Sequence, residues 1–120
     1  MELFGHKLSS LILCAPVGVQ KITYANAEEA TAAACQHLDI PMILSTAATR
    51  TIEEVAVANG DGHRWYQLYW PHPQDEEITL SLLKRAKETG FKVLVVTLDT
   101  FSVAWRPADV SHCPGNSKRF

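Results

Sequence analysis

The chain has 120 residues, of which 47% are hydrophobic, and its 11 basic and 13 acidic side chains give a formal net charge of -2. This hydrophobic content excludes a disordered chain, and the length fits one domain. The weakly acidic balance creates no basic field, so the sequence predicts no nucleic-acid partner. The apolar runs are far shorter than the roughly 20 residues of a spanning helix, so no membrane partner is predicted either.

The first residues and the cysteines indicate the compartment that we expect. Residues 1–7 lack the pattern of a signal peptide, which favours the cytosol or an organelle such as the peroxisome or mitochondrion. Cys14, Cys35 and Cys113 are an odd set without a Cys-x-x-Cys pair, so neither a disulfide framework nor a metal site is predicted. Cys14 and Cys35 lie in apolar and alanine-rich segments, where we expect them to pack as small hydrophobic side chains.

Short aliphatic runs alternate with longer helical patterns, which is typical of strand–helix units on a parallel sheet. Pro16 and Gly18 end the first run, Asn26 is placed to cap the first helix, and Gly90 is placed to end the third. The last run, rich in valine, is typical of a strand that is covered on both faces. In chain order we expect strand 11–15, helix 27–37, strand 42–45, helix 51–58, strand 64–70, helix 75–89 and strand 92–98.

Polar residues stand at the carboxyl ends of the predicted strands. Strands of this kind form either a doubly wound sheet or part of a (β/α)8 barrel, and a barrel gathers its strand-end residues around one mouth, where the active site lies. We therefore predict an α/β fold that is a partial (β/α)8 TIM barrel of about four strand–helix units. An unrelated doubly wound binding domain is the alternative. The strand-end residues are Ser45, Gln67, Tyr69, Thr97 and Asp99.

Several catalytic and nucleotide-binding motifs are absent from the sequence. It contains no Gly-x-Gly-x-x-Gly or Gly-x-x-x-x-Gly-Lys-[Ser/Thr] loop and no Gly-x-Ser-x-Gly turn, so dinucleotide, P-loop and serine hydrolase functions lose their main support. The amide of Gln67 and the hydroxyls of Ser45 and Thr97 offer both donors and acceptors. These groups suit noncovalent recognition of a polar planar ligand.

Five segments in order carry a resemblance to a known family. They are Ala-Pro-Val-Gly-Val-Gln at 15–20, Leu-Ser at 44–45, Trp-Tyr-Gln-Leu-Tyr-Trp at 65–70, Thr-Leu-Asp-Thr at 97–100 and Trp-Arg-Pro-Ala-Asp at 105–109. Together they resemble the FMN-dependent α-hydroxy acid dehydrogenase and oxidase family, and most of all its lactate 2-monooxygenase-like branch. On this resemblance we expect a partial domain over residues 1–110 and a divergent tail over 111–120.

The resemblance implies that the cofactor is FMN and that the substrate is a small 2-hydroxy acid. Backbone groups of the first strand-end loop would approach the flavin ring, and three polar side chains would bind its polar edge and tune its reduction potential. The implied cofactor-binding residues are Pro16, Val17, Gly18, Ser45, Gln67 and Thr97.

The resemblance also implies catalytic and substrate-binding residues. The phenol of Tyr69 would meet the substrate hydroxyl or the developing carbonyl, so Tyr69 has both roles. Asp99 would pair with an active-site histidine and raise the pKa of that histidine, and Arg106 would hold the substrate carboxylate. Each residue also has a simpler interpretation: Tyr69 could pack among aromatic side chains, Asp99 could begin a turn, and Arg106 could be solvated.

The family's Ser-Asn-His-Gly-x-Arg-Gln segment, with its catalytic histidine, has no match in this sequence. We therefore expect the N-terminal half of an FMN-dependent oxidoreductase, with weak or no activity alone. In the complete relative a lactate-like acid would become a 2-oxo acid or its decarboxylated product, and the enzyme would be a homo-oligomer. Oxidase, dehydrogenase and monooxygenase chemistry all stay open, and a noncatalytic half-barrel fragment is the alternative.

Overall fold

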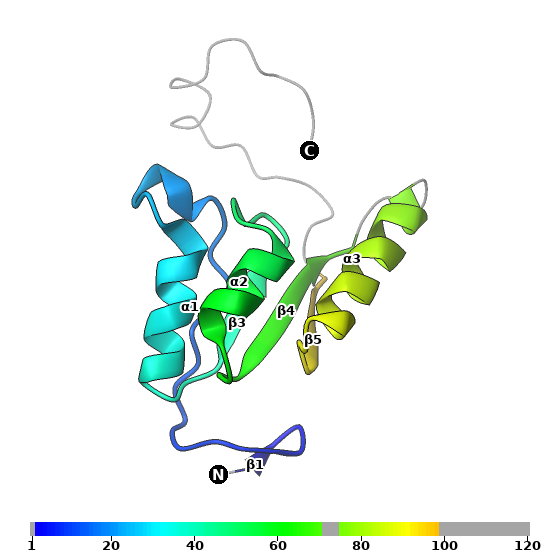
Figure 1. Cartoon of the computed structure of the whole chain (residues 1–120). Helices are drawn as coiled ribbons and strands as arrows, with labels where there is room; N and C mark the ends of the chain where they lie inside the picture. Colours follow the sequence, from blue (N-terminus) through cyan, green and yellow to red (C-terminus); the bar gives the residue numbers. More distant parts are fainter. Residues whose placement is uncertain (1, 71–74, 99–120) are drawn as a thin grey trace.

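A three-stranded parallel sheet is the framework of the described residues, 2–70 and 75–98, in the computed structural model of the chain (Figure 1). The elements are β1 (Glu2–Leu3), β2 (His6–Lys7), the 3-10 helix η1 (Gln20–Ile22), α1 (Ala27–His37), β3 (Met42–Ser45), α2 (Ile52–Asn59), β4 (Arg64–Tyr69), α3 (Glu76–Glu88) and β5 (Val93–Thr97). The predicted strands at 42–45, 64–70 and 92–98 and all three predicted helices are thus confirmed, with bounds that differ by at most one residue.

The sheet has the strand order β3-β4-β5, so each strand pairs with its successor in the chain. Ser45 pairs with Gln67 in the register of β3 and β4, and Tyr69 pairs with Thr97 in the register of β4 and β5. Because the strands are parallel, this register brings their carboxyl ends to one edge of the sheet.

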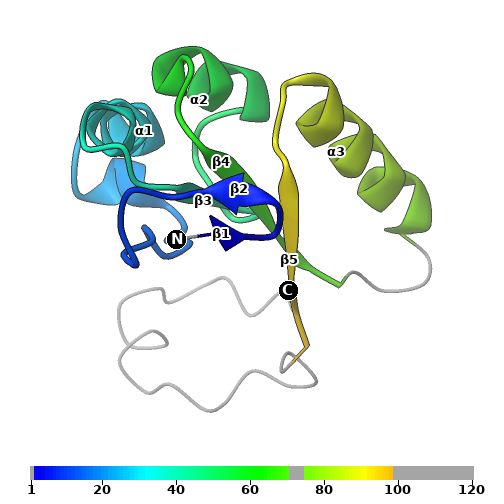
Figure 2. The ribbon, with the colours of Figure 1, turned by 90° about the horizontal axis from the view of Figure 1, so that it is seen from below.

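The helices α1, α2 and α3 cover one face of this sheet, as the view from below shows (Figure 2). Alternate strand residues point to opposite faces, and the buried residues Met42, Leu44, Tyr66 and Leu68 point to the helices. A doubly wound sheet carries helices on both faces, so the described residues do not have that arrangement. The helices contribute Ala32, Cys35, Ile52, Val55 and Ala86 to the same core.

Local signals explain where the helices begin and end. The Thr51 hydroxyl accepts a bond from the Glu54 amide (3.2 Å), and the Glu54 carboxylate accepts one from the Thr51 amide (2.8 Å), so α2 begins with a capping box. Asn26 occupies the N-cap of α1 as predicted, although its side chain makes no capping bond. Gly90 follows the end of α3 with φ of 84°, a conformation that favours glycine.

The strand predicted over residues 11–15 is wrong. The structure has one isolated parallel bridge there, in which the Cys14 amide donates to Pro41 O (2.9 Å) and the Ile43 amide donates to Cys14 O (3.1 Å). The run is apolar enough for a buried strand, but Leu11 is 76% exposed and the Ile12 amide bonds to Ser10 Oγ (3.0 Å). Only Cys14 therefore joins the sheet.

The expectation that the last strand is covered on both faces is also wrong for the described residues. Leu94 is 45% exposed, and the other residues of β5 are half-buried. The reason is its place in the sheet: β5 is an edge strand, with no described strand beyond it.

A short N-terminal hairpin, β1–β2, was not predicted from the sequence. Phe4 and Gly5 form its turn with φ of 50° and 77°, and two positive angles in succession are typical of the tight turns in hairpins. The ring of Phe4 packs edge-on against Trp65, with 5.6 Å between ring centroids. Strands of two residues are too short to show an alternating pattern. None of the helices that the structure describes is both long and apolar enough to cross a membrane.

Two valines of α2 provide a test of this one-sided core. Val55 is 0% exposed and Val57 is 82% exposed. We expect Val55→Ala to lower the free energy of unfolding by about 2 kcal/mol, because it removes buried methyl groups and leaves a cavity. The matched control Val57→Ala should change it by less than about 0.5 kcal/mol. Urea unfolding followed by circular dichroism measures both, and equal losses would contradict the core described above.

Candidate functional site

The side chain of Gln67 joins the carboxyl ends of three strands. Its Oε1 accepts hydrogen bonds from Ser45 Oγ (3.2 Å) and from the Thr46 amide (3.3 Å), and its Nε2 donates to Thr97 Oγ1 (2.8 Å). Gln67 is 2% exposed and Ser45 is 4% exposed, whereas Thr97 is half-buried. Ser45, Gln67 and Thr97 therefore form one hydrogen-bonded row across the sheet, which we call the strand-end row.

The loop of Pro16, Val17 and Gly18 lies against the loop that follows β3. The Val19 amide donates to Ala47 O (3.0 Å), and a Cβ added to Gly18 would lie 3.0 Å from the Ala47 Cβ. The Ala47 amide in turn donates to Ser45 Oγ (3.1 Å), a member of the strand-end row. A side chain at position 18 would push the two loops apart, so glycine permits this close approach.

Tyr69 lies at the end of β4 and opposite Thr97 in the register of β4 and β5. It is two residues after Gln67, so both side chains project from the face away from the helices. The tyrosine is 43% exposed, and its amide donates to Thr46 Oγ1 (3.2 Å), whose hydroxyl bonds to Gln67 O. The backbone at Tyr69 is thus fixed while its side chain stays accessible to a ligand.

The remaining predicted site residues cannot be placed in this geometry. Asp99 and Arg106 lie outside the described residues, as does Cys113. Cys35 is buried as predicted, and its burial and the neighbouring Cys14 raise the pKa of its thiol to about 12. Cys14 is half-buried. Residues 2–70 and 75–98 contain no group of three or more potential metal-binding side chains.

Comparison with known proteins identifies the family. Residues 1–118 match the family described as FMN-dependent dehydrogenase. The chain belongs to the FMN-dependent dehydrogenase family. Its sequence is 54% identical over 110 residues to an FMN-dependent alpha-hydroxy acid dehydrogenase of Penicillium citrinum, and 50% identical over 109 residues to one of Schizosaccharomyces pombe. These matches cover 92% and 91% of the chain.

The solved structures agree with this assignment. A lactate oxidase of Pediococcus acidilactici superposes with a TM-score of 0.87 at 30% sequence identity, over 93% of this chain and 31% of that one. The chain spans 27% of the length of each of the two fungal relatives. It therefore corresponds to an N-terminal portion of the enzymes in this FMN-dependent family.

The donors and acceptors of the site fit the FMN that this family uses. The polar edge of a flavin ring presents ring nitrogens and carbonyl oxygens, so a matching protein edge needs both donors and acceptors. Gln67 Nε2 keeps one N–H as a donor after it bonds to Thr97, and the hydroxyls of Ser45 and Thr97 keep lone pairs as acceptors. The close backbone approach at Gly18 adds peptide groups beside the same row.

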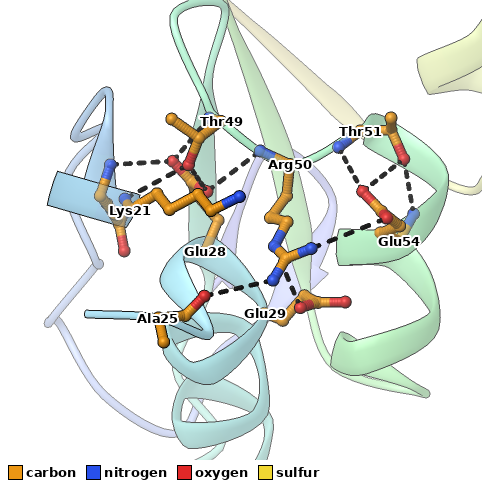
Figure 3. Close-up of polar contacts among 9 residues, drawn as sticks. Lys21, Ala25, Glu28, Glu29, Thr49, Arg50, Thr51 and Glu54 are labelled. Carbon is orange, nitrogen blue, oxygen red and sulfur yellow. Dashed lines mark hydrogen bonds and ion pairs between the residues drawn. The ribbon is translucent and has the colours of Figure 1, made fainter.

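Sequence reasoning missed a buried carboxylate behind these loops. Glu28, in the first turn of α1, is 0% exposed, and its two oxygens accept four hydrogen bonds from η1 and from the loop after β3 (Figure 3). The sequence signal was ambiguous, because Glu28 and Glu29 both fit the ordinary preference for acids at a helix start. Thr46, which connects Tyr69 to Gln67, was missed as well.

The protonation of Glu28 follows from these contacts. Burial by itself raises the pKa of the carboxyl, but hydrogen bonds from Thr49, from its own amide and from Gln20 favour the ionised form and hold the pKa below its usual value of 4.5. The ionised Glu28 carboxylate therefore stabilises the fold fully above about pH 4.5. This stabilisation is lost as the pH falls through the lowered pKa of Glu28 in the folded state.

The lowered pKa of Glu28 predicts how acid affects the stability of the wild-type chain and of a variant. At about pH 6, we expect Glu28→Gln to cost about 1–3 kcal/mol of unfolding free energy, because buried donors lose a charged acceptor. The difference should shrink as the pH falls toward about 3, since the wild-type chain then loses the same interaction. Urea unfolding across this range measures it, with Glu29→Gln as the control. A difference that is constant with pH would contradict the ionised, hydrogen-bonded state of Glu28.

Proposed function

We propose that the chain is the N-terminal part of an FMN-dependent oxidoreductase that oxidises a small, lactate-like 2-hydroxy acid. The observation that carries this proposal is the strand-end row, which places two hydroxyls and an amide at one edge of a parallel sheet. The family membership supplies the cofactor, and the lactate oxidase superposition supports the substrate class. The product would be a 2-oxo acid or its decarboxylated derivative.

The fold that we propose for the complete protein is a (β/α)8 barrel, of which this chain forms a part. Sequential parallel strands with all described helices on one face are the arrangement of a barrel wall. The bridge of Cys14 to Met42 adds a fourth chain segment beside β3. We propose a partial domain over residues 1–110 and a divergent tail over 111–120.

In this proposal the chain's residues bind and orient the cofactor. Ser45, Gln67 and Thr97 would bind the polar edge of the flavin, and the backbone from 16 to 18 would approach the ring. Gln67 is well suited to this task because its amide is already fixed by Ser45, Thr46 and Thr97, so little side-chain entropy is lost on binding. When bound, FMN accepts the two electrons that the hydroxy acid gives up.

Tyr69, Asp99 and Arg106 are the proposed substrate residues of this chain. Tyr69 presents an accessible phenol beside Thr97, where it would hydrogen-bond the substrate oxygen. Asp99 would orient a histidine of the complete enzyme, and Arg106 would pair with the substrate carboxylate; both roles rest on the resemblance of residues 97–100 and 105–109 to the family. We also propose that the complete enzyme is a homo-oligomer.

A noncatalytic half barrel is the second candidate function. It is favoured by the partly exposed edge strand β5, which has a strand partner on one side only among the described residues. An unpaired edge is a surface for pairing with another strand, so such a chain would associate with itself or with other chains.

Titration of the purified chain with FMN tests the proposed cofactor site. We expect quenching of flavin fluorescence by the wild-type chain and at least roughly tenfold weaker binding by Gln67→Leu, because this substitution leaves Ser45 and Thr97 without their central partner. Gln36→Leu, on the exposed surface of α1, makes the same chemical change away from the site and should bind as the wild type does. Equal FMN affinity of all three proteins would exclude Gln67 from the site.

Anaerobic mixing with lactate or glycolate separates the two functions. We expect the visible flavin absorption of the FMN-loaded chain to bleach slowly or not at all, because the proposed reaction needs the catalytic histidine segment that the sequence does not match. Joining the chain to the remainder of the Penicillium citrinum relative should restore bleaching. If the joined protein binds FMN and stays unbleached by any 2-hydroxy acid, the noncatalytic alternative is favoured.

A further inference from the structure

The loop beside the strand-end row has a strained residue. Val19 adopts φ of 52° and ψ of 36°, the left-handed region, where a β-branched side chain is rarely found. Such a conformation is energetically unfavourable and persists only when surrounding contacts impose it. The contacts that hold Val19 in this conformation also fix the position of the adjacent backbone at Gly18.

One of these contacts comes from the buried carboxylate of Glu28. Glu28 Oε1 accepts from the Gln20 amide (3.2 Å), directly after Val19, and from the Thr49 amide (2.9 Å). Oε2 accepts from Thr49 Oγ1 (2.7 Å) and from the Arg50 amide (3.2 Å). As Figure 3 shows, the carboxylate lies between η1 and the loop after β3, and it binds both.

Three further bonds extend this connection, one of them to Val17 in the loop of the proposed flavin site. The Gln20 side chain donates from Nε2 to Val17 O (3.2 Å), and its Oε1 accepts from Thr31 Oγ1 of α1 (2.6 Å). The Lys21 amide donates to Thr49 Oγ1 (3.3 Å), which itself bonds to Glu28. The backbone from 17 to 21 is thus fixed to α1 and to the loop after β3.

The neighbouring Glu29 shows what an ordinary acid at this helix start does. Its carboxylate pairs with Arg50 Nε (3.2 Å), and its side chain is 34% exposed. The Arg50 guanidinium also donates to Ala25 O (3.2 Å) and lies 3.9 Å from Glu54. Both glutamates can interact favourably with the helix dipole. Glu28 is the one whose carboxylate bonds to both η1 and the loop after β3.

We propose that Glu28 is a positioning residue, whose carboxylate holds the loop of Pro16, Val17 and Gly18 and the loop after β3 in fixed positions relative to each other. This inference rests on the proposed function, because those loops are proposed to face the flavin. A hydrogen bond to an ionised acceptor is about twice as strong as a neutral one, and the carboxylate accepts four. Displacement of η1 or of the loop after β3 breaks at least one of them, and Gln20 Nε2 passes the constraint from η1 to Val17 O.

Amide hydrogen exchange on the full chain, with and without FMN, tests this proposal. In Glu28→Gln we expect the amides of Gln20, Thr49 and Arg50 to exchange roughly tenfold faster or more, while amides of β4 keep their protection. Glu29→Gln is the matched control, since it changes the adjacent carboxylate in the same helical turn; in this variant the three amides should exchange as in the wild type. Glu28→Asp, with a shorter carboxylate, should restore part of the protection.

FMN binding adds a readout that a merely stabilising residue would not affect. We expect Glu28→Gln to weaken FMN binding by roughly tenfold and to shift the flavin absorption spectrum, at a temperature where circular dichroism shows both proteins folded. Unchanged exchange in both loops, or altered exchange with unchanged FMN affinity and spectrum, would overturn the proposal. If the wild-type chain takes up no FMN, the proposed function fails for this chain. The positioning role is then decided by amide exchange alone: faster exchange of Gln20, Thr49 and Arg50 in Glu28→Gln than in the wild type supports it.

Discussion

The proposed site depends on the hydrogen bonds that the side-chain amide of Gln67 makes to both neighbouring strands. Parallel strands bring their carboxyl ends together, but neighbouring strands are about 4.8 Å apart, so the side chains there need a common partner to form one surface. Gln67 supplies it, since its oxygen accepts from the β3 side and its nitrogen donates to the β5 side. An acid of the same shape could accept from Ser45 and Thr46, but once ionised it could not donate to Thr97.

Burial makes this row and the Glu28 carboxylate sensitive to change for the same reason. Gln67 and Glu28 are almost fully buried, and each has several partners among the described residues. Loss of one partner in such a network leaves a desolvated polar atom without a hydrogen bond, which costs more than the bond itself contributes. The two networks meet in the loop after β3, where Thr46 and Ala47 belong to the first, and Thr49 and Arg50 to the second.

The sequence predicted the elements well where local signals and packing agree. The bounds of α1 and β3 match the predicted ranges, because a polar start, an alanine-rich body and a short apolar run each favour one structure. The run over 11–15 shows the limit of this reasoning. Its residues favour a strand, but a strand also needs partners, and only Cys14 has one among the described residues.

The candidate site could be predicted only in part, for a physical reason. Ser45, Gln67 and Thr97 were found because strand ends and a family resemblance marked them. Their mutual bonds depend on the register between strands, which no single segment of sequence determines. Glu28 could not be predicted as a loop connection, because its partners at 20, 49 and 50 come from two loops without periodic pattern. The roles of all the predicted site residues stay predictions, and Asp99 and Arg106 also lie outside the described residues.

The chemistry of the strand-end row limits what it can do in catalysis. A carboxamide and two alcohols keep the same protonation state throughout the physiological pH range, so they can orient a ligand and adjust its electron distribution, but they are poor proton acceptors. The ionised Glu28 is held behind the loops by four donors and is not directed to a substrate. The described part of the chain is therefore suited to fixing the geometry and electrostatics of a flavin edge. In the proposed reaction the proton of the hydroxy acid must pass to a basic side chain outside this row, because neutral hydroxyls and amides are poor proton acceptors.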